Sequence, residues 1–284
     1  MLKRFLALLL LLPGSAMAVD GVREINQACA LAGCFPGDFP GFPVTINLSG
    51  SFRLTSDLDV RGVSTPENRS AIEVGNVGGS PALDVTIDMN GFAILGPVSC
   101  TGNPVTSCTP VGGTGDGIRT NGNPEAKIRI FNGLIRGMGS SGIDCNETCF
   151  VTDVIVEQSG SEGFADSNGE SIYTRCVARR NGASGFFVNG QVRDSLALGN
   201  ADTGIFTNPD SMIISSRSIE NGGNGVRCST CSLLDSLIND NLGVGVEFSG
   251  RPIYGRNLID GNDGGEISGS ALQVDVNRCG VSAC

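Results

Sequence analysis

The chain has 284 residues, of which 42 are glycine, 11 are cysteine and none is histidine, and its formal net charge is −10. So many glycines exclude a helical bundle, because a glycine inside a helix costs roughly 1 kcal/mol relative to alanine. The acidic balance excludes a protein that binds nucleic-acid phosphates along a basic stripe. The absence of histidine excludes Ser-His-Asp and Cys-His catalysis and every histidine-ligated metal site.

Residues 1–18 have the three parts of a secretory signal peptide. Lys3 and Arg4 supply the charged start, Phe5 to Leu12 form the apolar run, and Ala-Met-Ala forms a small-residue cleavage site at the end. The apolar run is too short to span a bilayer, and no second long apolar segment follows it. We therefore expect an exported protein, secreted or periplasmic, without a membrane span.

Residues 19–43 are expected to form an N-terminal cap. Asp20 can cap a short amphipathic helix that carries Val22, Ile25 and Cys29 and that ends at Gly33. A segment rich in proline and glycine follows, and strands are expected to start near residue 44. Such a helix covers the open strand edge at the start of a stacked β-structure.

Ten of the eleven cysteines form pairs that are close in sequence, and only Cys176 is left over. In an oxidising compartment this spacing predicts short local disulfides. The expected pairs are Cys29–Cys34, Cys100–Cys108, Cys145–Cys149, Cys228–Cys231 and Cys279–Cys284. A redox role for the Cys228-Ser-Thr-Cys231 segment requires a helix start after a strand, a context that the sequence lacks.

A glycine followed by an apolar residue recurs about every 21 residues, at Gly117, Gly142, Gly163, Gly185, Gly204, Gly225 and Gly245. An asparagine stands four residues before each of the last four glycines, at Asn181, Asn200, Asn221 and Asn241. Repeats of this length indicate a solenoid. The apolar residues within a repeat alternate as in short strands, so we expect parallel strands stacked about 4.8 Å apart and asparagines that hydrogen-bond along the stack.

The pattern D/R-x-small-x-V/A-x-x-N-x-x-x-G-I/F resembles the parallel beta-helix repeat of the pectate-lyase-like superfamily, from about residue 82 to 265. The resemblance implies a single-stranded right-handed parallel β-helix, here expected over 44–284. It does not imply an activity, because one fold hosts many functions. An insertion loop is expected at 98–115, closed by Cys100 and Cys108, and loops on a rigid scaffold often carry function. Asn-x-Ser/Thr sites stand at Asn47, Asn68 and Asn146.

Some members of the superfamily cleave polyuronates with an arginine or lysine base and Ca²⁺. By resemblance, Arg175 is a candidate base, with Asp153, Asp194 and Asp235 near a Ca²⁺ ion. The competing interpretation is a structural ladder of ion pairs, because carboxylates beside Arg175 stabilise its charged form. The epimerase motif Asp-Pro-His-Asp and the hydrolase element Gly-His-Gly are both missing. The sequence therefore leaves catalysis open.

Two outward-facing columns are candidates for binding. One contains Phe187, Phe206 and Arg227, and stacked rings beside polar groups suit a sugar face. The other is apolar and suggests a partner surface or a covering segment; it consists of Ile155, Val177, Leu196, Arg217 and Leu237.

The preferred interpretation is a secreted β-helix scaffold, without catalysis or cofactor, that binds a polysaccharide or a cell-surface glycan. The alternatives are a polysaccharide lyase acting on uronates, with Ca²⁺, and a structural or adhesion protein of the cell envelope. The sequence identifies neither the sugar nor the oligomeric state.

Overall fold

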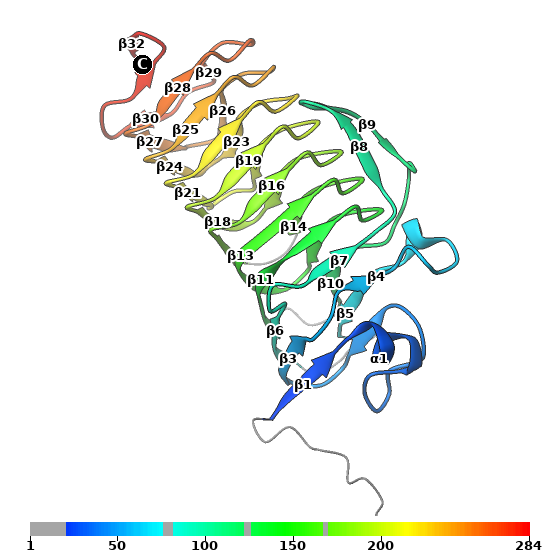
Figure 1. Cartoon of the computed structure of the whole chain (residues 1–284). Coiled ribbons are helices and arrows are strands. Elements are labelled where there is room, and N and C mark those ends of the chain that lie inside the picture. Colours follow the sequence, from blue (N-terminus) through cyan, green and yellow to red (C-terminus); the bar gives the residue numbers. More distant parts are fainter. Residues whose placement is uncertain (1–20, 76–81, 122–125, 167–169) are drawn as a thin grey trace, which may run out of the picture.

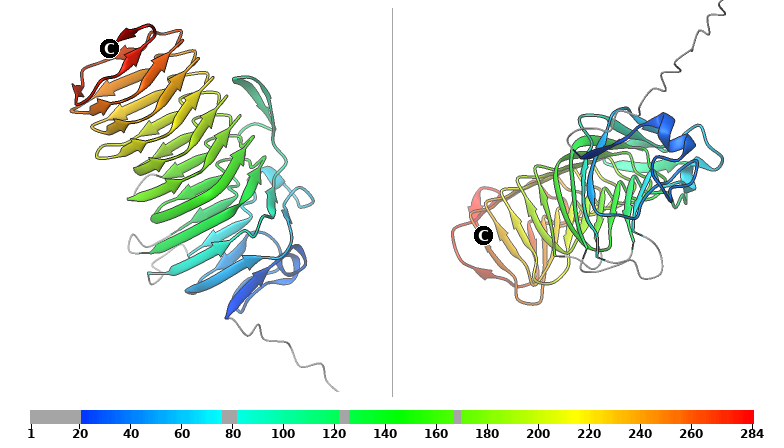
Figure 2. Two further views of the ribbon diagram at one scale, coloured as in Figure 1. Left: turned by 60° about the vertical axis from the view of Figure 1, so that its left-hand side comes forward. Right: turned by 90° about the horizontal axis from the view of Figure 1, so that it is seen from below.

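The computed structural model describes residues 21–75, 82–121, 126–166 and 170–284, so the expected signal peptide at 1–18 lies outside the described residues. The chain winds into a right-handed parallel β-helix whose coils stack along one axis (Figures 1 and 2). Within the described ranges, helix is limited to α1 (Gln27–Ala32) and the 3-10 turn η1 (Pro66–Asn68). The predicted all-β solenoid is confirmed.

One side of the β-helix is a parallel sheet in which the seven strands from β10 (Ile118–Thr120) to β26 (Val246–Ser249) each follow a repeat glycine. Its strands pair in the order β2 (Val44–Ile46), β5 (Ile72–Val74), β10 (Ile118–Thr120), β12 (Ile143–Cys145), β14 (Phe164–Asp166), β17 (Phe186–Val188), β20 (Ile205–Thr207), β23 (Val226–Ser229), β26 (Val246–Ser249) and β29 (Ile267–Ser268). We call it the glycine-side sheet. Its register places the first residue of each of these strands above the equivalent residue of the next, from Ile118 and Ile143 to Val246.

The other strands form a larger sheet that bends once in every coil. Before the bend lie β1 (Val22–Ile25), β3 (Gly50–Leu54), β6 (Asp84–Asp88), β15 (Ser171–Thr174), β18 (Gly190–Arg193), β21 (Met212–Ile214), β24 (Ser232–Leu234), β27 (Ile253–Gly255) and β30 (Leu272–Gln273). After it lie β4 (Leu58–Asp59), β7 (Ala93–Leu95), β16 (Val177–Arg179), β19 (Leu196–Leu198), β22 (Arg217–Ile219), β25 (Leu237–Asn239), β28 (Leu258–Asp260) and β31 (Arg278–Cys279), while β11 (Lys127–Arg136) and β13 (Thr148–Glu157) run through the bend. The last strand, β32 (Ser282–Ala283), pairs antiparallel with β31.

The bend is made by residues with a left-handed backbone. Asp153, Arg175, Asp194 and Asp235 have φ between 50° and 56°, a conformation that costs non-glycine residues roughly 1–2 kcal/mol. Directly after the bend stand Ser195, Ser216 and Ser236. Each of their hydroxyl groups accepts a backbone N–H from the equivalent residue of the preceding coil; the N–H of Cys176, for example, donates to Oγ of Ser195 at 3.1 Å. Small polar residues at this place in the sequence therefore satisfy the backbone where the sheet turns.

The expected asparagine ladder is present. The Nδ2 group of Asn181 donates to Oδ1 of Asn200 at 2.9 Å, and the same contact links Asn200 to Asn221, Asn221 to Asn241 and Asn241 to Asn262. Each Oδ1 atom also accepts the backbone N–H of the asparagine before it. These side chains are buried and have no access to water, so the ladder provides the hydrogen-bonding partners that the buried amide groups need.

The N-terminal cap differs from the prediction at its start. Residues Val22–Ile25 form a strand that pairs with β3, and the helix begins after them, with Asn26 as its cap. The side chain of Asn26 accepts the N–H of Cys29 at 2.9 Å, while Asp20 lies outside the described residues. The strand forms because it covers the free edge of β3, which local helical spacing does not reveal. The predicted end of the helix at Gly33 is confirmed.

The insertion at 98–115 contains the antiparallel hairpin of β8 (Ser99–Gly102) and β9 (Val105–Thr109), closed by Cys100–Cys108. The hairpin lies along the side of the coils (Figure 1). The backbone N–H of Val105 donates to the carbonyl of Gly199 at 3.0 Å, and the Nδ2 group of Asn103 donates to Oε2 of Glu220 at 2.8 Å. The insertion is therefore a strap across successive turns.

All five predicted disulfides are present, and Cys176 is free and buried.

Candidate functional site

The outer surface of the glycine-side sheet carries one continuous column of side chains. Along it Ala165, Phe187, Phe206, Arg227 and Glu247 pair in register on β14, β17, β20, β23 and β26. Each is the second residue after a repeat glycine, and the residue before it points into the core. Because side chains alternate along a strand, the repeat itself places these five side chains on the outside.

The centre of the column is an aromatic pair beside a cation. The rings of Phe187 and Phe206 meet edge to face with centroids 4.9 Å apart, a favourable geometry for two aromatic rings. The guanidinium carbon of Arg227 lies 4.9 Å from the centroid of Phe206, and its Nε atom lies 3.4 Å from a carboxylate oxygen of Glu247. The structure thus brings the three residues of the sugar-binding hypothesis together.

A hollow of about 300 Å³ lies over this pair. The adjoining turns supply most of its polar groups; its lining consists of Glu162, Ser184, Phe187, Asp202, Thr203, Phe206, Gly223, Asn224 and Arg227. The floor is therefore aromatic and the walls carry hydroxyl, amide and carboxylate groups, as small-molecule sites commonly do.

Sequence reasoning missed the walls of the hollow, although a signal for them exists. Glu162, Ser184, Thr203 and Asn224 each stand directly before a repeat glycine, so they form a second column beside the aromatic one. Asn224 is held firmly, because its Nδ2 group donates to Glu247 at 2.8 Å and its Oδ1 atom accepts the N–H of Val244 at 2.9 Å.

The candidate lyase residues lie elsewhere, at the bend of the larger sheet. Arg175 forms a two-pronged ion pair with Asp153, with both hydrogen bonds at 2.7 Å. This contact raises the pKa of Arg175 and lowers the pKa of Asp153; Asp194 adds a smaller effect on Arg175. A catalytic base must be unprotonated before it can take a proton from the substrate. Because the ion pair holds Arg175 in its protonated form, the geometry favours the ladder of ion pairs over the base.

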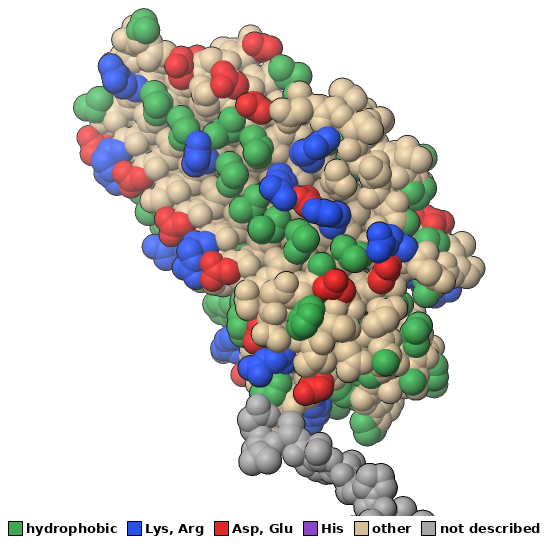
Figure 3. Space-filling view, viewed as in Figure 1, with side chains coloured by type: hydrophobic (Ala, Val, Ile, Leu, Met, Phe, Trp, Pro, Cys, Tyr) green, Lys and Arg blue, Asp and Glu red, His purple; other side chains and the backbone are tan. Residues whose placement is uncertain are grey.

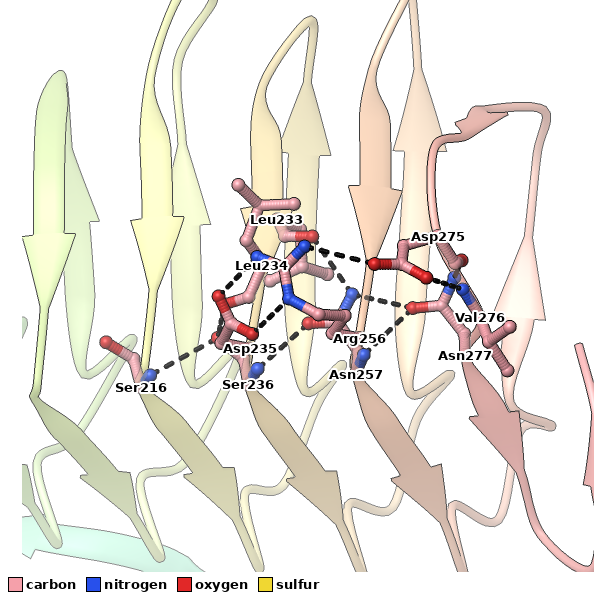
Figure 4. A network of polar contacts seen from close by, with 10 residues as sticks. All are labelled: Ser216, Leu233, Leu234, Asp235, Ser236, Arg256, Asn257, Asp275, Val276 and Asn277. Carbon is pink, nitrogen blue, oxygen red and sulfur yellow. Dashed lines mark hydrogen bonds and ion pairs between the residues drawn. The ribbon is translucent and has the colours of Figure 1, made fainter.

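Asp235 belongs to a second ladder that the sequence analysis did not identify. Arg256 binds both oxygens of Asp235, at 2.6 and 2.7 Å, and contacts Asp275 on its other side at 3.2 Å (Figure 4). Arg256 stands one repeat after Asp235 in the same column, which is the signal that could have found it. The positive charge of Arg256 offsets the repulsion between the two aspartates on either side of it.

In the part of the chain that the structure describes, no three aspartate, glutamate or cysteine side chains gather in a way that could hold a metal ion. Asp153, Asp194 and Asp235 are not among any such group.

The apolar column lies on the outer face after the bend, where Figure 3 shows hydrophobic side chains gathered among basic ones. Ile155, Val177, Leu196 and Leu237 are half-buried and Arg217 is exposed. On the same face Glu157 lies between Arg136 and Arg179 and forms ion pairs with both. The face is thus mixed in character.

No family model matches the chain, and no curated protein matches it in sequence. Among solved structures the chain is similar to the A-module of a mannuronan C-5 epimerase from Azotobacter vinelandii, with 15% identity and a TM-score of 0.46 over 90% of this chain and 84% of that one. It is also similar to a periplasmic alginate epimerase, with 14% identity and a TM-score of 0.47 over 90% and 83% of the two chains. A Geobacillus virus E2 protein follows, with 11% identity and a TM-score of 0.34 over 81% of this chain and 52% of that one.

At these values the similarities add nothing to the description of the fold. The chain is a parallel β-helix protein by its own strand pairing. No helix within the described residues is long and apolar enough to cross a membrane.

Proposed function

We propose that this protein is an exported carbohydrate-binding β-helix, and that the hollow over Phe187 and Phe206 holds a sugar ring. The observation that carries the proposal is the aromatic pair on the floor of a hollow with polar walls. The apolar face of a sugar packs against aromatic rings, while its hydroxyl groups need hydrogen-bonding partners around the rim.

The β-helix suits this role because it holds the site rigidly. Phe187 and Phe206 lie on neighbouring strands whose backbones are hydrogen-bonded in register, so little ordering is needed on binding, and a preorganised site loses less entropy. Binding of this kind needs no cofactor and no catalytic group. Five disulfides agree with an oxidising compartment, as an exported protein requires.

The proposal is tested on a glycan array, with affinities then measured by titration calorimetry. We expect the wild-type protein to bind at least one oligosaccharide, and Phe187→Ala and Phe206→Ala each to weaken that binding about tenfold or more, since stacking of a ring contributes on the order of 1–2 kcal/mol. Phe39→Ala is the matched control, because Phe39 is exposed and far along the chain from the hollow.

Equal binding by all three variants contradicts the proposal. An unsaturated product released from a polyuronate, and lost in Arg175→Ala, favours the lyase alternative instead.

A further inference from the structure

We infer that the ring held over Phe187 and Phe206 is a neutral or amine-bearing sugar and not a uronate. The inference rests on the proposed carbohydrate binding and concerns the class of sugar that the hollow accepts. It follows from the charges around the aromatic floor.

Two carboxylates line the hollow directly. Glu162 enters from the turn before β14, one coil before Phe187, and Asp202 enters from the turn before β20, in the coil of Phe206. Glu162 accepts a hydrogen bond from Ser161, and Asp202 is exposed. Carboxylate oxygens accept hydrogen bonds from sugar hydroxyl groups or from an ammonium group. They offer a uronate no donor and repel its charge.

Among the described residues that line the hollow, Arg227 is the only cation, and it already has partners in the protein. Arg227 lies over the ring of Phe206 and pairs with Glu247, which also accepts the amide N–H of Asn224. Its positive charge is therefore balanced before a ligand arrives. A uronate that used Arg227 would have to compete with Glu247 for it.

The next residues along the same face add negative charge. Asp144 lies two coils before Phe187 in the outward column and close enough to Glu162 for their charges to interact. Its partner Arg119 lies 3.7 Å away. Around the hollow, four carboxylates (Asp144, Glu162, Asp202 and Glu247) thus face two guanidinium groups. The net charge of the whole chain, −10, has the same sign, so long-range steering also disfavours an acidic glycan.

A matched set of ligands tests the inference. For glucose, galactose and mannose skeletons, the neutral oligosaccharide, its amino-sugar equivalent and its uronic-acid equivalent are compared at low salt and slightly acidic pH, so that the amines are charged. We expect the uronate to bind at least tenfold more weakly than the neutral sugar of the skeleton that binds. Added salt should weaken only the amino-sugar complex, because exposed charges are screened.

Two variants identify the charges responsible. Asp202→Asn and Glu162→Gln should each narrow the preference against the uronate by about threefold to tenfold, the size expected for one partly exposed charge a few ångströms away. Asp210→Asn is the control, because Asp210 is an exposed carboxylate that does not line the hollow.

The two claims fail in different ways. A uronate that binds best, and that loses binding in Phe187→Ala, overturns this inference and leaves the proposed function intact. An unchanged preference in both Asp202→Asn and Glu162→Gln also overturns it. Binding of every sugar class that is insensitive to Phe187→Ala, or no binding at all, overturns the proposed function and with it this inference.

Discussion

Asn221 lies in the middle of the buried asparagine ladder and shows what a single residue contributes. Its Oδ1 atom accepts both the side-chain and the backbone N–H of Asn200, and its Nδ2 group donates to Asn241. All three residues are fully buried. Removing this amide therefore takes the acceptor from the backbone and side-chain N–H groups of Asn200, in a place that water does not reach, and leaves Oδ1 of Asn241 with the backbone N–H of residue 221.

We expect Asn221→Ala to lower the free energy of unfolding by about 2–4 kcal/mol, since each buried group left unpaired costs about 1–3 kcal/mol. Urea denaturation followed by circular dichroism measures this. Asn208→Ala, a half-buried asparagine outside the ladder, should cost less than about 1 kcal/mol. Equal losses in the two variants would show that the ladder adds no stability.

Asp116 makes stability depend on pH. It is 2% exposed, accepts the N–H of Ser141 at 2.9 Å, and its pKa is raised to about 6, chiefly by burial. A pKa raised above the unfolded value means that the folded state is favoured while the group is protonated. The contribution is complete below about pH 4 and is lost as the pH rises through about 6.

We therefore expect Asp116 to lower stability by up to about 3 kcal/mol between these pH values. Asp116→Asn should remove this part of the pH dependence, because an amide oxygen accepts the same N–H without ionising. Urea denaturation of both proteins from about pH 4 to pH 7 measures the difference. Parallel curves for wild type and variant would contradict the assignment.

Cys176 is the free cysteine among the described residues, and burial raises the pKa of its thiol to about 12. Thiolate is the reactive form, so the native protein should not react with iodoacetamide. After denaturation without reductant, mass spectrometry should find a single alkylated cysteine, at position 176. Rapid labelling of the native protein would show that the coil around it opens.

At the scale of elements, the N-terminal strand shows where local sequence patterns fail. Val22 and Ile25 are spaced as on a helix, yet they lie in a strand, because β1 completes the edge of β3. Helix α1 then starts at the next side chain able to cap it, Asn26. At an exposed sheet edge, strand pairing outweighs the helical preference of the local sequence. Because the edge is formed by residues distant in the sequence, no local pattern predicts it.

The insertion hairpin rests on small residues of successive turns. Its disulfide lies beside Gly182, where an added Cβ atom would stand 2.9 Å from Sγ of Cys108. Val98, Cys100 and Val105 form a small cluster of their own, separate from the main core. The hairpin should therefore be able to leave the coils without unfolding them.

Replacing both Cys100 and Cys108 by serine should free the hairpin, because a hairpin with so small a core depends on its closure. Limited proteolysis should then cut within residues 99–109, while the melting temperature of the coils falls by only a few degrees. The matching double variant at Cys279 and Cys284 should leave the hairpin uncut. Loss of all cooperative unfolding in the first variant would mean that the hairpin holds the coils together.

At the scale of the whole molecule, the repeat accounts for what could be predicted. Because the repeat has a period of about 21 residues, equivalent residues of successive coils lie above one another. The asparagine ladder and the pairing of Phe187 with Phe206 could therefore be predicted from the sequence. The walls of the hollow were missed, because they lie in turns, where strand alternation gives no guide; four of them do stand directly before a repeat glycine, but Asp202 does not. The partner of Asp235 was missed because Arg256 lies after the last repeat glycine, Gly245, and the column of charged residues was followed only as far as Asp235.

The β-helix as a whole is a scaffold on which equivalent residues of successive repeats form continuous columns on the outer surface. Its outer columns hold charged ladders at the bend, a mixed apolar face after it, and the aromatic hollow on the glycine-side sheet. Of these surfaces in the described residues, the hollow combines a concave shape, two half-buried aromatic rings and a polar rim, which suit a small ring-shaped ligand. The central claim is therefore local to that hollow.

A crystal structure of the protein with a bound oligosaccharide tests this claim most directly. The account predicts electron density for one sugar ring packed on Phe187 and Phe206, with hydroxyl groups within hydrogen-bonding distance of Glu162 or Asp202. Density for the sugar at the bend beside Arg175, or on the apolar face around Leu196, with the hollow left to solvent, would contradict it.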